Sequence, residues 1–289
     1  MKTKSMVKYL FVAATVGILF SSCKKKTDNT DNDTAAASDN ALAEGTYNDV
    51  HNIADQAINN NVTSYSPVNT SGEKGICSLC AFSILIDTTT NPVPGTHTMS
   101  ITFGSGNNAT VNCLCQDGRY RRGTINVTWS GRYRDAGSSH TITFTNYYVN
   151  DNQIMGTKTV TNNGYNGAGH LTFSISVNGT IIKANGGGTI TWTSSRTREW
   201  IAGESTPTWS DDEYLITGSA SGTNAAGNSF TAAITTPLDV KLNCHYIVAG
   251  AFSITPSGKP TRSVDFGNGV CDNQATVTIN GNVYNITLH

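Results

Sequence analysis

The chain has 289 residues, of which only 13 % are charged, and its formal net charge is −1. Such a balance creates no strong overall field, so nucleic acid is not an expected partner. The 28 glycines and 7 prolines, with abundant Thr, Ser and Asn, are typical of many strands joined by tight turns. Roughly 240 residues remain after an N-terminal leader and tether are subtracted, enough for one large all-β domain or two small ones.

The first residues have the charge order of an export signal. Three lysines within the first eight residues precede an apolar run of 12 residues, Tyr9 to Phe20, which is too short to span a bilayer. Two serines then precede Cys23, an ending that resembles the lipobox of bacterial lipoproteins, in which the Cys is the cleavage site and then carries the acyl chains. We therefore expect a lipoprotein signal peptide over 1–22 and a lipidated Cys23 that makes membrane lipid a partner. The alternative is an ordinary signal peptide with an incidental Cys.

The segment after Cys23, KKKTDNTDNDTAAASDNALAE, is polar and of low complexity. A segment of this kind buries too little apolar surface to fold, so 23–44 is predicted to be a lipid anchor with a disordered tether. Within it, Asp33-Thr34-Ala35 resembles the D-[ST]-aliphatic O-glycosylation motif of Bacteroidetes. Thr34 is therefore a candidate modification site.

Residues 45–60 are the one helical candidate. Val50, Ile53, Ala54 and Ile58 fall on one face at helical spacing, and three consecutive asparagines at 59–61 end the pattern. We expect a short helix laid on the edge of a sheet, followed by a linker that ends at residue 75.

From residue 76 to residue 289 apolar and polar residues alternate with a period of two, which predicts an all-β domain. No long apolar helix separates the runs, so the sheet is expected to be antiparallel, with many short strands in a meander or a sandwich. The predicted strands are Ala81–Ile86, His97–Phe103, Arg122–Trp129, His140–Val149, Ile154–Thr161, Leu171–Val177, Thr180–Ala184, Thr189–Thr193, Tyr214–Ser219, Ser229–Thr235, Tyr246–Thr255, Arg262–Phe266, Ala275–Ile279 and Val283–Leu288.

Asn-Gly pairs and one run of glycines predict where the chain turns. Asn178-Gly179 and Asn280-Gly281 each lie between two alternating runs, the strongest short signal for a hairpin, because both central residues need positive φ. Asn163-Gly164, Asn268-Gly269 and the three glycines at 186–188 mark other turns.

The two ends of the β region share a sequence pattern. AFSI at 81–84 recurs at 251–254, and TMSITFG at 98–104 matches TRSVDFG at 261–267. Each copy has cysteines upstream and downstream. We interpret this echo as two related β-units on either side of the middle strands.

Six of the seven cysteines remain once Cys23 is lipidated, an even number in an oxidising compartment. The disulfide candidates are Cys77, Cys80, Cys113, Cys115, Cys244 and Cys271. The echo pairs the last two with each other and joins the first two to the middle two. A zinc site on the four N-terminal thiolates is a rival, as is a redox-active Cys77-Ser78-Leu79-Cys80, but export favours disulfides.

One stretch combines aromatic rings with charges. Its candidate ligand-binding residues are Trp192, Arg196, Arg198, Trp200 and Trp209. Tryptophan faces next to arginines suit sugar rings, and a pair of acids among Glu199, Glu204 and Glu213 suits glycoside hydrolysis. Against both, Arg and Trp alternate along a strand, so cross-strand pairing and Arg–Trp stacking account for them. A second basic run is expected to be an exposed salt-bridge ladder with Asp117 and Asp135, and the alternative is a contact with an acidic glycan. Its members are Arg119, Arg121, Arg122, Arg132 and Arg134.

No motif for a known reaction is present. The sequence lacks HExxH, GxSxG, a P-loop and a Rossmann glycine pattern. We therefore expect no catalytic residue, no metal and no cofactor, and predict that the protein is not an enzyme.

Several segments together resemble a family of uncharacterised Bacteroidetes outer-membrane lipoproteins. They are SSCKK at 21–25, YNDV at 47–50, GRYRD at 131–135, GTKTVTN at 156–162, SRTREW at 195–200 and DFGNGVCDN at 265–273. The resemblance covers nearly the whole chain from Gly45. It implies a lipid-anchored location in the outer membrane and supplies no catalytic residue.

The sequence thus predicts an envelope-anchored lipoprotein with a structural or interaction role. The alternatives are a glycan-binding surface module and a hydrolase that uses Glu199, Glu204 or Glu213. Besides lipid, the expected partner is an envelope protein or a glycan.

Overall fold

The computed structural model describes residues 31–59, 82–87, 96–104, 111–115, 117–206 and 208–288, without the side chains of 55–59, 82–87 and 209. The expected signal peptide, the lipidated Cys23, most of the linker, and Cys77 and Cys80 lie outside the described residues. Residues 32–289 form one compact unit. No helix in the described ranges has both the length and the apolar character needed to cross a membrane.

One long helix and a series of strands make up this unit. In chain order the elements are α1 (Ala35–Asn59), β1 (Phe82–Asp87), β2 (Thr96–Phe103), β3 (Cys113–Leu114), β4 (Tyr120–Ser130), β5 (Ser139–Val149), β6 (Asn152–Tyr165), β7 (Leu171–Ile182), η1 (Ala184–Gly186), β8 (Thr189–Ala202), η2 (Trp209–Asp211), β9 (Glu213–Thr223), β10 (Ser229–Lys241), β11 (Ala249–Pro256), β12 (Arg262–Asn268), β13 (Gln274–Ile279) and β14 (Asn282–Thr287).

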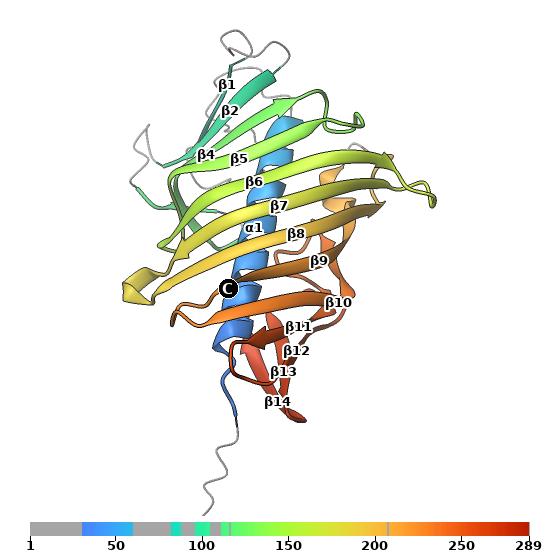
Figure 1. The fold of residues 1–289 in the computed structure, drawn as a ribbon. Coiled ribbons are helices and arrows are strands. Elements are labelled where there is room, and N and C mark those ends of the chain that lie inside the picture. Colours follow the sequence, from blue (N-terminus) through green and yellow to red (C-terminus); the bar gives the residue numbers. More distant parts are fainter. Residues whose placement is uncertain are drawn as a thin grey trace, which may run out of the picture. The chain divides into compact units, whose positions relative to one another are not determined.

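The described strands all belong to one sheet, in which consecutive strands pair except that β2 pairs directly with β4, and the short β3 pairs only with β4 (Figure 1). Every pairing is antiparallel. The predicted antiparallel all-β class is confirmed, and the sheet is the extended meander. Along β7 and β8 buried and exposed residues alternate, so one face of each strand is covered and the other meets water.

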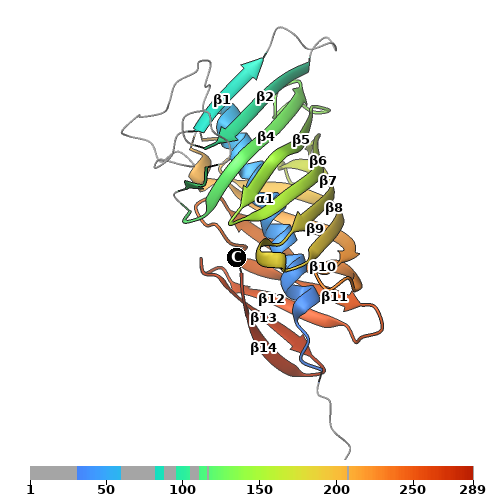
Figure 2. The same cartoon turned by 90° about the vertical axis from the view of Figure 1, so that its left-hand side faces the viewer.

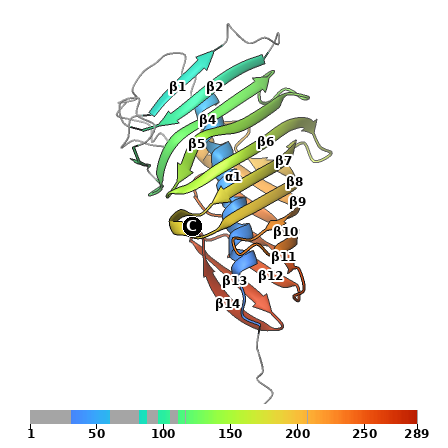
Figure 3. The same cartoon turned by 60° about the vertical axis from the view of Figure 1, so that its left-hand side comes forward.

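Helix α1 covers the buried face. Figures 1, 2 and 3 show it running across the strands rather than along them. Val50, Ile53 and Ala54 of the predicted apolar face are buried, as expected. The predicted position was wrong, however, because α1 lies across the face of the sheet and not on its edge. An open sheet with one apolar face needs such a cover, since that face would otherwise meet water.

The start of α1 corrects the predicted tether. The helix begins at Ala35, so 35–44 is not disordered, and Gly45 lies inside the helix. Thr34 stands at its N-cap, where its carbonyl accepts the Ser38 amide at 2.9 Å. The helix forms because its alanines pack closely on the sheet and its polar side chains have partners there. The polar composition alone did not indicate it, since those partners lie far away in the sequence.

Asn178-Gly179 is not a hairpin turn, and the two strands predicted around it are the single strand β7. Gly179 is buried beneath the ring of Tyr47 from α1: a Cβ at Gly179 would lie 2.0 Å from Tyr47 Oη. The Tyr47 hydroxyl reaches past it and donates to the carbonyl of Met155 at 2.8 Å. This glycine is therefore required by a helix side chain and not by a turn.

The other glycine signals gave mixed results. Asn280-Gly281 forms the predicted β13–β14 hairpin, with φ of 51° and 83°. Asn163-Gly164 is not a turn, because it lies within β6 at a register shift against β7. The bulge accommodates the extra residue and leaves the strand continuous.

The two copies of the echo fall in two strand pairs near opposite ends of the sheet, β1–β2 and β11–β12. Their registers differ. Phe103 pairs with Phe82 in the first copy, whereas Phe252 pairs with Val264 in the second. The common ancestry of the two units stays a prediction.

Candidate functional site

The predicted ligand surface on β8 is part of the core. Trp192, Arg196, Arg198 and Trp200 are at most 5 % exposed, because all four share the phase of β8 that faces α1. The alternative of an exposed ligand-binding surface does not hold for these four residues, whereas their burial agrees with the interpretation that they pack within the structure. The side chain of Trp209, in η2, lies outside the described part of the chain.

Side chains from the N-terminal half of α1 hold this part of β8. The Trp192 ring stacks on Tyr47 with centroids 5.6 Å apart, and its indole N–H donates to Asn40 at 2.9 Å. Arg196 forms an ion pair with Glu44 at 2.6 Å, and both side chains are at most 4 % exposed. Glu44 therefore compensates a charge that the sheet could not bury alone.

Arg198 is held by aromatic rings. Its guanidinium lies 4.5 Å from the ring centroid of Tyr214 and 4.8 Å from that of Phe173, and it donates to the Tyr133 hydroxyl. Tyr133 also contacts His51 of α1, whose Nε2 lies 3.1 Å from the same hydroxyl. These rings and cations form a packed layer between helix and sheet.

The three hydrolase candidates, Glu199, Glu204 and Glu213, share no hydrogen bond or ion pair with one another in the described residues. Glu199 contacts His170 at 2.7 Å, Glu204 accepts from Tyr165 at 2.5 Å, and Glu213 lies 3.6 Å from Lys241. Each carboxylate has its own surface partner. The His170 contact, with a further hydrogen bond from Asn166, lowers the pKa of Glu199, which favours its ionised form.

Cys244 and Cys271 form the disulfide that the echo predicted. Cys113 and Cys115 each take part in a disulfide as well. In the described ranges no group of three or more His, Cys, Asp or Glu is placed to hold a metal ion, while Cys77 and Cys80 of the zinc alternative lie outside those ranges.

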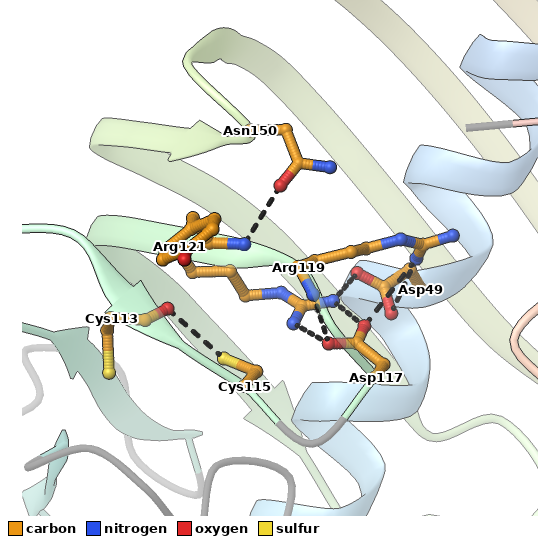
Figure 4. Close-up of polar contacts among 8 residues, drawn as sticks. Asp49, Cys113, Cys115, Asp117, Arg119, Arg121 and Asn150 are labelled. Atoms are coloured by element: carbon orange, nitrogen blue, oxygen red, sulfur yellow. Dashed lines mark hydrogen bonds and ion pairs between the residues drawn. The ribbon is translucent and has the colours of Figure 1, made fainter.

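The second charged cluster lies where β4 begins, next to the C-terminal half of α1 (Figure 4). The buried guanidinium of Arg121 donates to Asp117 at 2.5 Å and 2.8 Å and to Asp49 of α1 at 2.7 Å. Burial is the largest single influence on Asp117 and opposes its ionisation, but the hydrogen bonds and charge of Arg121, together with the charge and backbone amide of Arg119, outweigh it and lower the pKa of that carboxyl. Burial raises the pKa of the adjacent Tyr147, so this phenol stays neutral.

Arg119 completes the cluster more loosely. Its guanidinium lies 3.4 Å from Asp49 and 3.8 Å from Asp117. The predicted exposed ladder was wrong for Arg119 and Arg121, which are 8 % and 0 % exposed. A signal was present in the sequence, because both residues share the odd-numbered phase of Ile125 on β4, whereas Arg122 does not.

A half-open pocket of about 170 Å³ adjoins this cluster. Its lining residues are Leu42, Thr46, Asp49, Arg119, Val149, Asn150, Asn152 and Ile154. Helix α1, the start of β4 and the β5–β6 turn therefore form the pocket together. No local sequence motif indicates such a pocket, because its residues are far apart in the sequence.

No protein-family model, curated protein or solved structure matches this chain.

Proposed function

We propose that this protein is an envelope-anchored lipoprotein of the outer membrane with a non-catalytic, structural or interaction role. The leader and Cys23 support the anchor. Residues 24–34 separate Cys23 from α1, and an extended chain of that length reaches at most roughly 40 Å. The sheet would therefore stay close to the membrane that holds the lipid.

The observation that carries the interaction role is the outward face of the sheet. Cross-strand pairing aligns mostly short polar residues into uncharged ranks that run from β2 across the sheet, and the longest rank meets a charged residue, Asp87, only at β1. The longest rank is Thr98, Thr128, Thr141, Thr159, Ser176, Ser195, Ser219, Ala233, Ser253, Ser263 and Thr278. A second is Ser100, Asn126, Thr143, Thr157, Asn178, Thr193, Ser221, Thr231 and Thr255.

This face suits contact rather than chemistry. Ser176, Ser195 and Ser219 at the centre of the longest rank are exposed. Their hydroxyls both donate and accept hydrogen bonds, and a partner's groups meet no fixed charge there. The acidic residues of the hydrolase alternative have separate surface partners, so the geometry favours the interaction role.

A labelling experiment tests the anchor. Cells expressing the full chain are fed an alkyne fatty acid, and the mature protein is assayed for the label. We expect label on the native protein and none on Cys23→Ala. An unlabelled native protein would overturn the lipoprotein proposal.

Site-specific cross-linking in intact cells tests the face. A photo-cross-linking residue is placed at Ser195 or Ser219, on the outward face, and at the exposed Ala226 in the β9–β10 turn as the control. We expect a discrete adduct from the two face positions and none from Ala226. Identical adducts from all three positions, or none from the face, would contradict the proposed surface.

A further inference from the structure

The pocket between α1 and the β5–β6 turn has a balanced set of charges. Asp49 and Arg119 line it with one charge of each sign, and Asp117 and Arg121, which are paired with them, add a second charge of each sign beside it. A charged ligand would therefore enter a partly buried site without an opposite charge to meet it, which costs free energy. A neutral ligand avoids this cost.

The hydrogen-bonding groups in the pocket are unequally used. Arg121 makes the short bonds to both carboxylates, so Arg119 is left with two long ion pairs and no side-chain hydrogen bond from its guanidinium in the described residues. Arg119 is nonetheless 8 % exposed and lines the cavity. Apart from these ion pairs and the Tyr246 ring 6.0 Å away, its N–H groups are available in the pocket to hydrogen-bond water or a ligand.

Two amides and a hydroxyl extend this set. The side-chain oxygen of Asn150 accepts from the Tyr120 amide at 2.9 Å, and that of Asn152 accepts from the Ala184 amide at 2.9 Å. Both side-chain NH₂ groups then remain as donors, and Thr46 adds a hydroxyl. Asp49 adds an acceptor, so the lining offers both donors and acceptors to the hydroxyl groups of a ligand.

Aliphatic side chains form the rest of the lining. Leu42 comes from α1, and Val149 and Ile154 come from β5 and β6. Among the described residues the lining itself contains no aromatic ring, so this apolar wall suits C–H groups rather than a flat π system. Combined apolar and polar lining of this kind is typical of small-molecule sites.

We propose that this pocket binds a neutral, hydroxyl-rich small molecule of the size of one sugar residue. Arg119, Asp49, Asn150 and Thr46 contact its hydroxyls, and Leu42, Val149 and Ile154 contact its C–H face. The site differs from the tryptophan-rich segment that the sequence suggested for glycans, because that segment is buried beneath α1. The proposal does not depend on the lipid anchor.

Saturation-transfer NMR and calorimetry on the purified full chain test it. The neutral probes are the methyl glycosides of glucose, galactose, mannose and N-acetylglucosamine, and the charged probes are glucuronate and glucosamine. We expect at least one neutral glycoside to bind and both charged probes to bind more weakly. Binding of none of the neutral glycosides, or tighter binding of a charged probe, would overturn the proposal.

Two variants place the binding in the pocket. Arg119→Lys keeps the charge balance but loses the guanidinium fork, and should weaken binding by about tenfold. Leu42→Trp fills the cavity from the half-buried helix surface and leaves every charged residue in the sequence, and should abolish binding. The matched control is Arg122→Lys, whose side chain pairs with the exposed Asp151 outside the pocket. Circular dichroism verifies the fold of each variant, and unchanged binding by folded Leu42→Trp would refute the site.

Discussion

The two faces of this sheet are built from the same strands but follow different rules. On the inward face of β8, Trp192, Arg196 and Arg198 each have a specific partner on α1 or among the rings beneath it. On the outward face of the same strand, Thr193, Ser195 and Thr197 meet water. The inward face is therefore specified by individual contacts, whereas the outward face needs only short polar residues with high strand preference.

The comparison predicts its largest effect at the buried ion pair. Glu44→Ala leaves Arg196 buried without a counter-charge and should lower the free energy of unfolding by about 3–5 kcal/mol, measured by urea denaturation. Glu213→Ala, which breaks the more exposed pair with Lys241, should cost less than about 1 kcal/mol. The double variant Glu44→Gln/Arg196→Met should recover most of the loss. Equal costs for the two single variants would show that α1 does not depend on this pair.

Gly179 tests the contact between α1 and the middle of the sheet. Gly179→Ala places a methyl group against Tyr47 and should destabilise the protein by about 1–3 kcal/mol in thermal or urea unfolding. Gly167→Ala is the control, because a Cβ there meets nothing within 4 Å. In combination with Tyr47→Ala, the Gly179 substitution should cost less than it does alone. A Gly179→Ala variant as stable as its control would contradict the placement of Tyr47.

The inward face should also make stability depend on pH through His51. Burial lowers the pKa of His51 well below its ordinary 6.5, and Arg198, Lys158 and His140 lower it further. The unfolded chain then takes up a proton that the folded chain does not. Stability is therefore full above pH 6.5 and falls by about 1.4 kcal/mol per unit as the pH decreases below it, until the folded-state pKa is reached.

Urea denaturation between about pH 5 and pH 7.5 measures this slope above the range in which most carboxyls titrate. The slope should largely disappear in His51→Gln. It should persist in His245→Gln, which changes an exposed histidine. A wild-type slope in the His51 variant would assign the effect to another group.

The smallest effect is expected where one substitution is made on both faces. Ser195→Thr points outward and should change the free energy of unfolding by no more than about 0.5 kcal/mol. Ser194→Thr adds the same methyl group to a side chain that is 5 % exposed on the inward face, and should be clearly more destabilising. The two residues are adjacent, so the difference between the urea midpoints of the two variants measures the effect of the face on which the methyl group is added. Equal midpoints would remove the distinction between the faces on β8.

The sequence by itself determined the properties that local pattern encodes. Alternation fixed the antiparallel strands, Asn280-Gly281 fixed a hairpin, and the echo identified the Cys244–Cys271 disulfide. These features depend on neighbouring residues or on a repeated motif, and both can be found along the chain.

Only the tertiary structure decided where α1 begins, which face it covers and what each buried charge meets. Ala35 starts the helix because alanines, Asp39, Asn40 and Glu44 find partners more than a hundred residues away. Gly179 lies inside β7, where the absence of a side chain leaves room for the ring of Tyr47 from α1. Arg121 is buried because Asp49 and Asp117 meet it there. The alternation along β4 places Arg121 on the inward face, but its partner Asp49, like the partners of the helix side chains and of Gly179, depends on long-range compensation of charge or volume that no local pattern records.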